Sequence, residues 1–108
     1  MKKLKFKDFK ARWILDDKKT ATMRLFDDKD LKVGDELELI NSDTGTIFAH
    51  ARISEVINKK LSELIESDFQ GHEKWKSIEE MYDGFRKYYG DKVGPSTAVK
   101  IIRFSTHD

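Results

Sequence analysis

Short segments of the chain alternate apolar and polar residues at every second position, which is the pattern of β-strands with one buried face. The clearest are residues 20–25, 36–41 and 46–57. The turn residues Asp43-Thr44-Gly45 separate the last two segments and predict that they pair as a hairpin. Strands joined by such short turns are antiparallel, because a parallel pair needs a crossover connection of about a dozen residues.

Two further strands are predicted at the ends of the chain. Leu4 and Phe6 alternate with lysines, and residues 97–105 are rich in β-branched side chains. We expect these strands to form a mostly antiparallel sheet that curls into a small barrel, because closure removes exposed strand edges. At 108 residues the chain has room for one domain. The predicted fold class is therefore α+β, a small β-barrel with flanking helices in a single domain of residues 1–108.

Three segments have apolar residues at helical spacing. Residues 9–14 and 61–65 each predict a short helix, and residues 78–89 predict a longer one. Ser77 and Glu80 form a capping box at the start of this longer helix, because each side chain can satisfy a free backbone N–H of the first turn.

The composition excludes several kinds of site. The chain has no cysteine, which excludes a disulfide framework, a thiolate zinc site and a cysteine nucleophile. Its three histidines, His50, His72 and His107, are far apart in sequence, so we expect no metal site and no cofactor. No stretch approaches the 18 apolar residues that a membrane span needs, and the first residues lack the apolar run of a secretory signal. We expect a cytoplasmic protein without a membrane partner.

Charge is concentrated near the N-terminus. Residues 1–24 contain nine lysines and arginines against three aspartates, whereas the whole chain has a formal net charge of +1. These basic residues either contact phosphate or form a solvated surface that keeps the protein soluble.

Three segments, in this order along the chain, resemble the ASCH domain family. They are Ile14-Leu15-Asp16-Asp17-Lys18-Lys19-Thr20-Ala21-Thr22-Met23-Arg24, then Lys32-Val33-Gly34-Asp35, and finally Ile101-Ile102-Arg103-Phe104. The resemblance spans nearly the whole chain and implies a PUA-like fold with a cleft, together with a role linked to RNA. Asp17 stands where the family usually has glycine, and aspartate tolerates the left-handed turn better than most residues.

Some small bacterial members of this family hydrolyse the acyl amide of N4-acetylcytidine. The resemblance implies that their lysine, threonine and glutamate correspond to Lys19, Thr22 and Glu73, which would form a catalytic set. If the correspondence with the family is shifted by one residue in the loop 69–76, Lys74 instead of Glu73 falls at the glutamate position. Asp17 would favour the protonated amine of Lys19 and oppose its use as a base.

Four other residues are candidate ligand contacts: Thr20, Arg24, His72 and Trp75. Thr20, Thr22 and Arg24 have the pattern of the outward face of any half-buried strand, and this face is either plain solvated surface or the lining of a functional cleft. His72 could assist proton transfer or be a solvated loop residue. Trp75 is a candidate for stacking on a base.

Three functions remain open on the sequence. The first is binding of RNA or a nucleoside in a cleft lined by Lys19, Thr22 and Arg24. The second is hydrolysis of N4-acetylcytidine by Lys19, Thr22 and Glu73. The third is a protein-interaction adaptor whose partner the sequence does not identify.

Overall fold

The five strands form one mixed sheet. The computed structural model describes residues 1–107. Within these residues the sheet order is β1-β3-β4-β5-β2, and only the β1 and β3 pair is parallel. The strands are β1 (Lys2–Phe6), β2 (Ala21–Leu25), β3 (Glu36–Asn41), β4 (Ile47–Lys60) and β5 (Ala98–His107). The predicted β3 and β4 hairpin is confirmed, with Leu37 opposite Ala51.

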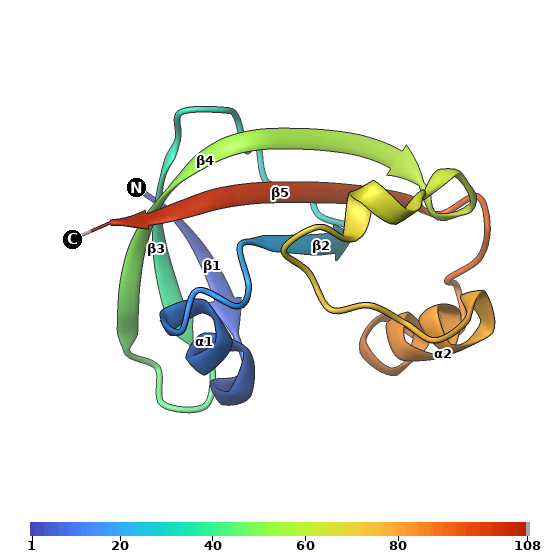
Figure 1. Cartoon of the computed structure of the whole chain (residues 1–108), viewed down its shortest axis with the longest axis horizontal. Coiled ribbons are helices and arrows are strands. Elements are labelled where there is room, and N and C mark those ends of the chain that lie inside the picture. Colours follow the sequence, from blue (N-terminus) through green and yellow to red (C-terminus); the bar gives the residue numbers. More distant parts are fainter. Residues whose placement is uncertain (108) are drawn as a thin grey trace.

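The sheet curls into a half-barrel rather than a closed barrel. The long strands β4 and β5 run side by side across the molecule, and their register shifts between Ile53 and Glu55 (Figure 1). The two sheet edges, β1 and β2, are bridged by a side chain, because Arg24 of β2 donates a hydrogen bond of 2.7 Å from Nη2 to the carbonyl oxygen of Lys5. The predicted α+β class, PUA-like and mostly antiparallel with flanking helices, is confirmed.

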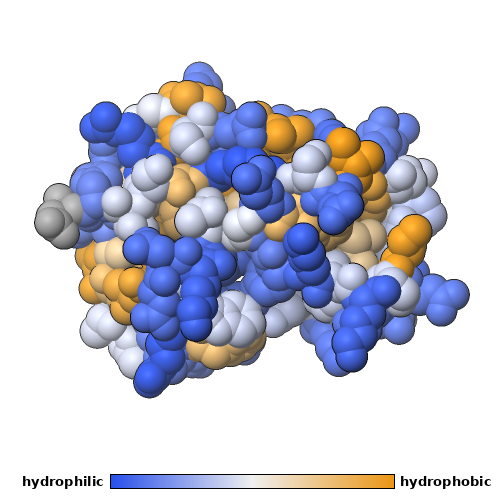
Figure 2. Space-filling model, viewed as in Figure 1, coloured by the Kyte–Doolittle hydropathy of each residue, from blue (hydrophilic) through white to orange (hydrophobic). Residues whose placement is uncertain are grey.

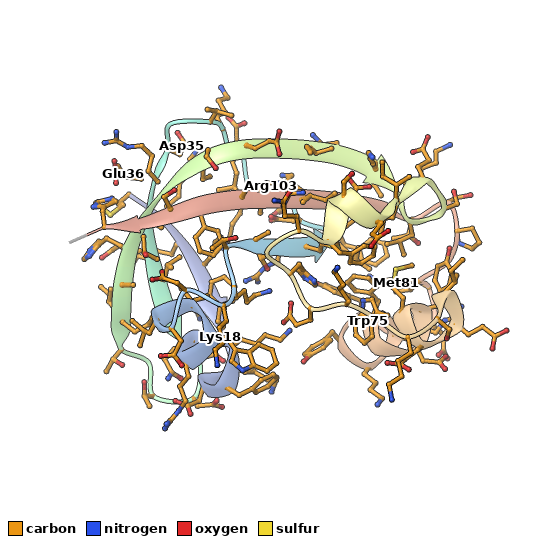
Figure 3. All side chains as sticks on the ribbon, viewed as in Figure 1. Lys18, Asp35, Glu36, Trp75, Met81 and Arg103 are labelled. Atoms are coloured by element: carbon orange, nitrogen blue, oxygen red, sulfur yellow. The ribbon has the colours of Figure 1, made fainter. Side chains whose placement is uncertain are left out.

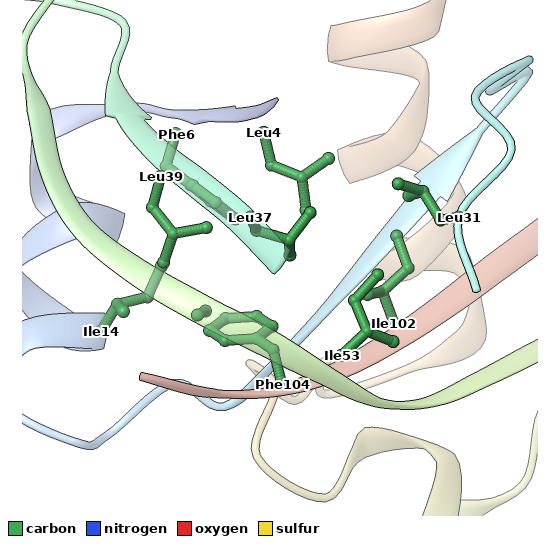
Figure 4. Close-up of a cluster of buried hydrophobic side chains, with 10 residues drawn as sticks. Leu4, Phe6, Ile14, Leu31, Leu37, Leu39, Ile53, Ile102 and Phe104 are labelled. Atoms are coloured by element: carbon green, nitrogen blue, oxygen red, sulfur yellow. The ribbon is translucent and has the colours of Figure 1, made fainter. Parts of the chain in front are cut away.

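Alternation of apolar residues supplies a core inside the curl of the sheet. Leu4, Leu37 and Leu39 are at most 1% exposed and pack with Ile102 and Phe104 of β5 (Figure 4). A second cluster lies between β5 and the last helix. Burial of this kind contributes about 25 cal/mol per Å² of apolar surface, so these side chains hold the strands in register.

Two α-helices flank the sheet: α1 (Asp8–Leu15) and α2 (Ile78–Tyr89). Ser77 caps α2 as predicted, with its Oγ accepting a hydrogen bond of 3.1 Å from the backbone N–H of Glu80. Only Ala11 and Ile14 of α1 are buried. In Figure 1, α1 and α2 lie apart from each other below the sheet, with the loop that leads into α2 between them. Neither helix in residues 1–107 is long and apolar enough to cross a bilayer.

The predicted helix over residues 61–65 is wrong. Strand β4 continues to Lys60, which pairs with Ala98, and the chain then forms the 3-10 turns Leu61–Glu63 and Glu66–Phe69. Of the three apolar residues that suggested a helix, Leu61 is buried but Ile65 is 59% exposed. Arg103 of β5 reaches these turns and donates a hydrogen bond to the carbonyl oxygen of Ser67 (Figure 3).

Gly71 fixes the start of the loop before α2. Its carbonyl oxygen accepts hydrogen bonds from the backbone N–H groups of Thr20 and Ala21, at 2.8 and 3.1 Å. Its φ is +74°, and a Cβ at this position would collide with Oγ1 of Thr20. The loop is thus tied to the start of β2 by a contact that only glycine permits.

We expect Gly71→Ala to lower the free energy of unfolding by more than the roughly 1–2 kcal/mol that a left-handed non-glycine residue costs, because steric collision adds to backbone strain. The matched control is Gly45→Ala, since Gly45 has a φ of +77° but no neighbouring atom within 4 Å of the place that a Cβ would occupy. Urea unfolding of both variants measures the difference. Equal losses would show that the Thr20 contact does not matter.

Candidate functional site

A cleft of about 410 Å³ lies between α1 and α2. Strand β2 lines it with Thr22 and Arg24, and the loop before α2 lines it with His72, Glu73 and Trp75. Hydrophilic side chains cover much of the surface between the two helices (Figure 2). The structure thus brings five of the seven predicted site residues to one cavity. A sixth, Lys19, does not line the cavity but contacts the side chain of Glu73.

Lys19 and Glu73 form an ion pair across 54 positions of sequence, with 2.7 Å between Nζ and Oε2. The Lys19 side chain is only 2% exposed. Burial lowers the pKa of Lys19 from 10.5 to about 8, although attraction to Glu73 opposes the shift. Asp17 adopts the left-handed turn expected of it, with φ 59°.

The carboxylate of Glu73 is only half satisfied. Burial raises its pKa, but the positive charge of Lys19 and the hydrogen bond from it hold the pKa of Glu73 below its ordinary range. Oε1 is buried and has no hydrogen-bond partner within residues 1–107. The nearest cation on that side is Nζ of Lys10, 3.9 Å away, which also lies 4.9 Å from the centre of the Tyr88 ring. Lys10 therefore bridges α1 and α2 across the cleft.

His72 is a buried neutral residue rather than the solvated alternative, with its side chain 8% exposed. Burial and the nearby Lys19 lower its pKa to about 4. Its Nδ1 lies 2.8 Å from the carbonyl oxygen and 3.1 Å from Oε2 of Glu73. Both neighbours are acceptors, so Nδ1 carries the proton and Nε2 is left as an acceptor.

Thr22 is buried, contrary to its expected place on an outward strand face. It is 5% exposed and lines the cleft instead of open surface. Arg24 also lines the cleft, but its guanidinium lies 4.9 Å from the Phe6 ring and bonds to Lys5. Arg24 thus bridges the two edges of the sheet as well as lining the cavity.

Trp75 forms part of the cleft wall and lies between the loop and α2 (Figure 3). Its ring centre is 6.1 Å from that of Phe85, and a Cβ at Gly84 would collide with the indole. Its buried Nε1 has no hydrogen-bond partner within residues 1–107. The absence of a side chain at Gly84 is what allows the indole to lie against α2.

Besides Lys19, two predicted candidates lie outside the cleft. Thr20 is exposed and faces a second, polar cavity, which is also lined by Lys19, Gln70 and Arg103. Lys74, the alternative to Glu73, is exposed and borders an apolar groove on the other side of Trp75. Lys19 therefore separates the cleft from the second cavity, and Glu73 rather than Lys74 pairs with it.

Sequence reasoning missed Lys10. It follows Phe9 and precedes Trp13 by three positions, so these residues share one side of α1. The apolar spacing suggested a buried stripe, but Phe9 is 46% and Trp13 is 37% exposed at the cleft. An expected core-facing stripe is thus part of a cleft wall.

No three His, Asp or Glu side chains in residues 1–107 are grouped closely enough to hold a metal ion. The arrangement instead offers the Thr22 hydroxyl and the Glu73 carboxylate in one cavity, with the buried ammonium of Lys19 bound to that carboxylate. These groups can orient a polar ligand, move a proton and stabilise negative charge.

A scan against protein-family models gives no match, and a search of curated proteins finds no relative. Solved structures are similar, at low identity. An ASCH domain from Lactobacillus crispatus is 18% identical with a TM-score of 0.70, covering 89% of this chain and 69% of that one. ASCH from Zymomonas mobilis is 11% identical with a TM-score of 0.69, covering 98% and 67%. The hypothetical protein PH0355 is 21% identical with a TM-score of 0.74, covering 99% and 100%. These likenesses confirm the fold that the sequence motifs predicted.

The lowered pKa of Lys19 predicts a pH-dependent stability. Between pH 8 and 10.5 the unfolded chain keeps a proton that folded Lys19 releases, so the free energy of unfolding should rise with pH in this window. The contribution is at most about 1.4 kcal/mol per pH unit. Urea unfolding of the wild type and of Lys19→Met at several pH values in this range isolates the contribution of Lys19, because the variant lacks the titrating amine. Parallel curves for the two proteins would contradict the prediction.

Proposed function

Because the chain has the fold of ASCH domain proteins, we propose that its cleft binds a nucleoside or a nucleotide of an RNA. One observation carries the proposal: the half-satisfied Glu73 faces the same cavity as the aromatic wall of Trp75, Phe85 and Tyr88. A planar base with polar edges suits such a cavity, because it stacks on rings and hydrogen-bonds at its rim. The volume of about 410 Å³ is within the usual range for small-ligand sites.

Stacking on Trp75 gives the first test of this proposal. We expect Trp75→Leu to weaken cytidine binding by about 5- to 150-fold, since a base–aromatic stack contributes about 1–3 kcal/mol. Tyr82→Leu is the matched control, because Tyr82 is an aromatic residue of α2 that borders the apolar groove instead of the cleft. Calorimetric titration measures both, with the fold of each variant checked by circular dichroism. Absence of cytidine and RNA binding by the wild type would refute the proposal.

A second function is favoured by the ion pair of Lys19 and Glu73. We propose that the cleft also hydrolyses the acyl amide of N4-acetylcytidine. Thr22 would attack the acyl carbon and lose its proton to the neutral form of Lys19, a fraction of about one tenth at pH 7 for a pKa of about 8. The C–N bond then breaks, the amine nitrogen takes that proton and cytidine leaves. Water releases the acyl group from Thr22 as a carboxylic acid.

The roles of these residues predict a distinct pattern of rates. Thr22→Val keeps the side-chain shape and removes the hydroxyl, so we expect at least a 100-fold loss of cytidine release, and the same for Lys19→Met. Thr20→Val is the control, because Thr20 belongs to the same segment but lies outside the cleft. In the wild type the rate should rise with pH up to about 8, as Lys19 loses its proton. Chromatography measures the product, and equal rates in Thr22→Val and wild type would rule out the hydroxyl as nucleophile.

A further inference from the structure

The two walls of the cleft differ in chemistry. One wall is formed by the end of β1 and the start of α1, and it presents Lys5, Lys7 and Lys10. The opposite wall belongs to α2 and presents Phe85, Tyr88 and Tyr89. A ligand that spans the cleft therefore meets cations on one side and aromatic rings on the other.

The cations of the first wall are poorly neutralised. Lys5 and Lys7 are exposed, and no carboxylate in residues 1–107 forms an ion pair with either. The Nζ of Lys10 lies 3.9 Å from Oε1 of Glu73, which is longer than a hydrogen bond. By contrast, Lys2 pairs with Asp35 at 2.6 Å.

Nearby carboxylates are engaged elsewhere. Asp8, which follows Lys7 in sequence, accepts hydrogen bonds from Arg12 and from the side-chain amide of Asn41. Asp43 accepts the backbone N–H of Asp8 at 2.8 Å. The positive potential on this wall is therefore not cancelled locally, and a concave surface concentrates it.

We propose that the ligand is a phosphorylated nucleotide, with its base against α2 and its phosphate on Lys5 and Lys7. This inference rests on the proposed function and narrows its ligand class. A neutral nucleoside would gain nothing from the basic wall, whereas a phosphate placed there forms charge-assisted hydrogen bonds and releases counterions. Lys10, whose ammonium reaches from the basic wall toward Glu73 and Tyr88, then contacts the sugar side of the phosphate or the base edge near Glu73.

The test compares cytidine, cytidine 5′-monophosphate, cytidine 3′-monophosphate and a short single-stranded oligocytidylate by calorimetric titration at low salt. We expect at least one phosphorylated ligand to bind 10-fold or more tightly than cytidine. In the double variant Lys5→Gln and Lys7→Gln this advantage should disappear, while the affinity for cytidine stays the same. The salt dependence should also flatten, by about one unit of slope for each lost phosphate contact.

Lys3→Gln is the matched control. Lys3 is exposed on the same strand as Lys5, but it does not line the cleft. We expect this variant to keep the full advantage of the phosphorylated ligand. An equal loss in Lys3→Gln would show a diffuse surface charge effect and overturn the phosphate subsite.

The outcomes separate this inference from the function beneath it. Equal affinities of the wild type for cytidine and for all phosphorylated ligands would overturn the inference and leave nucleoside binding standing. No binding of any of these ligands would overturn both. If the mononucleotides bind more tightly than cytidine, the ligand is a free nucleotide. If only the oligonucleotide binds more tightly than cytidine, the ligand is RNA.

Discussion

The burial of a lysine ammonium against one carboxylate is the constraint on which the candidate site depends. Transfer of a charge out of water costs several kcal/mol unless a partner and hydrogen bonds offset it. Lys19 has Glu73 as that partner, and Glu73 lies in the loop before α2, outside the sheet. Burial of the Lys19 ammonium is therefore tolerated only when this loop is folded against the sheet. The same contact thus stabilises both the fold and the candidate site.

The loop before α2 is fixed at both ends, which explains why it can hold the polar side chains of the cleft in defined positions. At its start Gly71 accepts backbone hydrogen bonds from Thr20 and from Ala21, the first residue of β2. At its end Ser77 caps α2. Between them His72 and Glu73 bond to each other, so the acceptor on the imidazole and the free carboxylate oxygen keep a defined direction. Preorganised groups of this kind bind or react without a large reordering cost.

Much of the fold could be predicted from the sequence because it depends on local periodicity. Alternation located the first four strands, β-branched residues located β5, and the capping box located the start of α2. The pattern at residues 61–65 misled because one buried leucine is compatible with a 3-10 turn as well as with a helix. The pairing of Lys19 with Glu73 came from family resemblance, since no local pattern joins residues 54 positions apart. The part played by Lys10 needed coordinates, because only the distance to Glu73 and Tyr88 distinguishes it from other surface lysines.

The contact of Trp75 with the backbone of Gly84 has an evolutionary consequence. A side chain at position 84 and an indole at position 75 compete for the same space, so the two positions cannot change independently. Descendants that acquire even a methyl group at position 84 must replace the indole by a smaller side chain or move it away, which reshapes this wall of the cavity in a single step. Selection can therefore alter the shape of the cavity through this pair of positions without changing Lys19, Thr22 or Glu73.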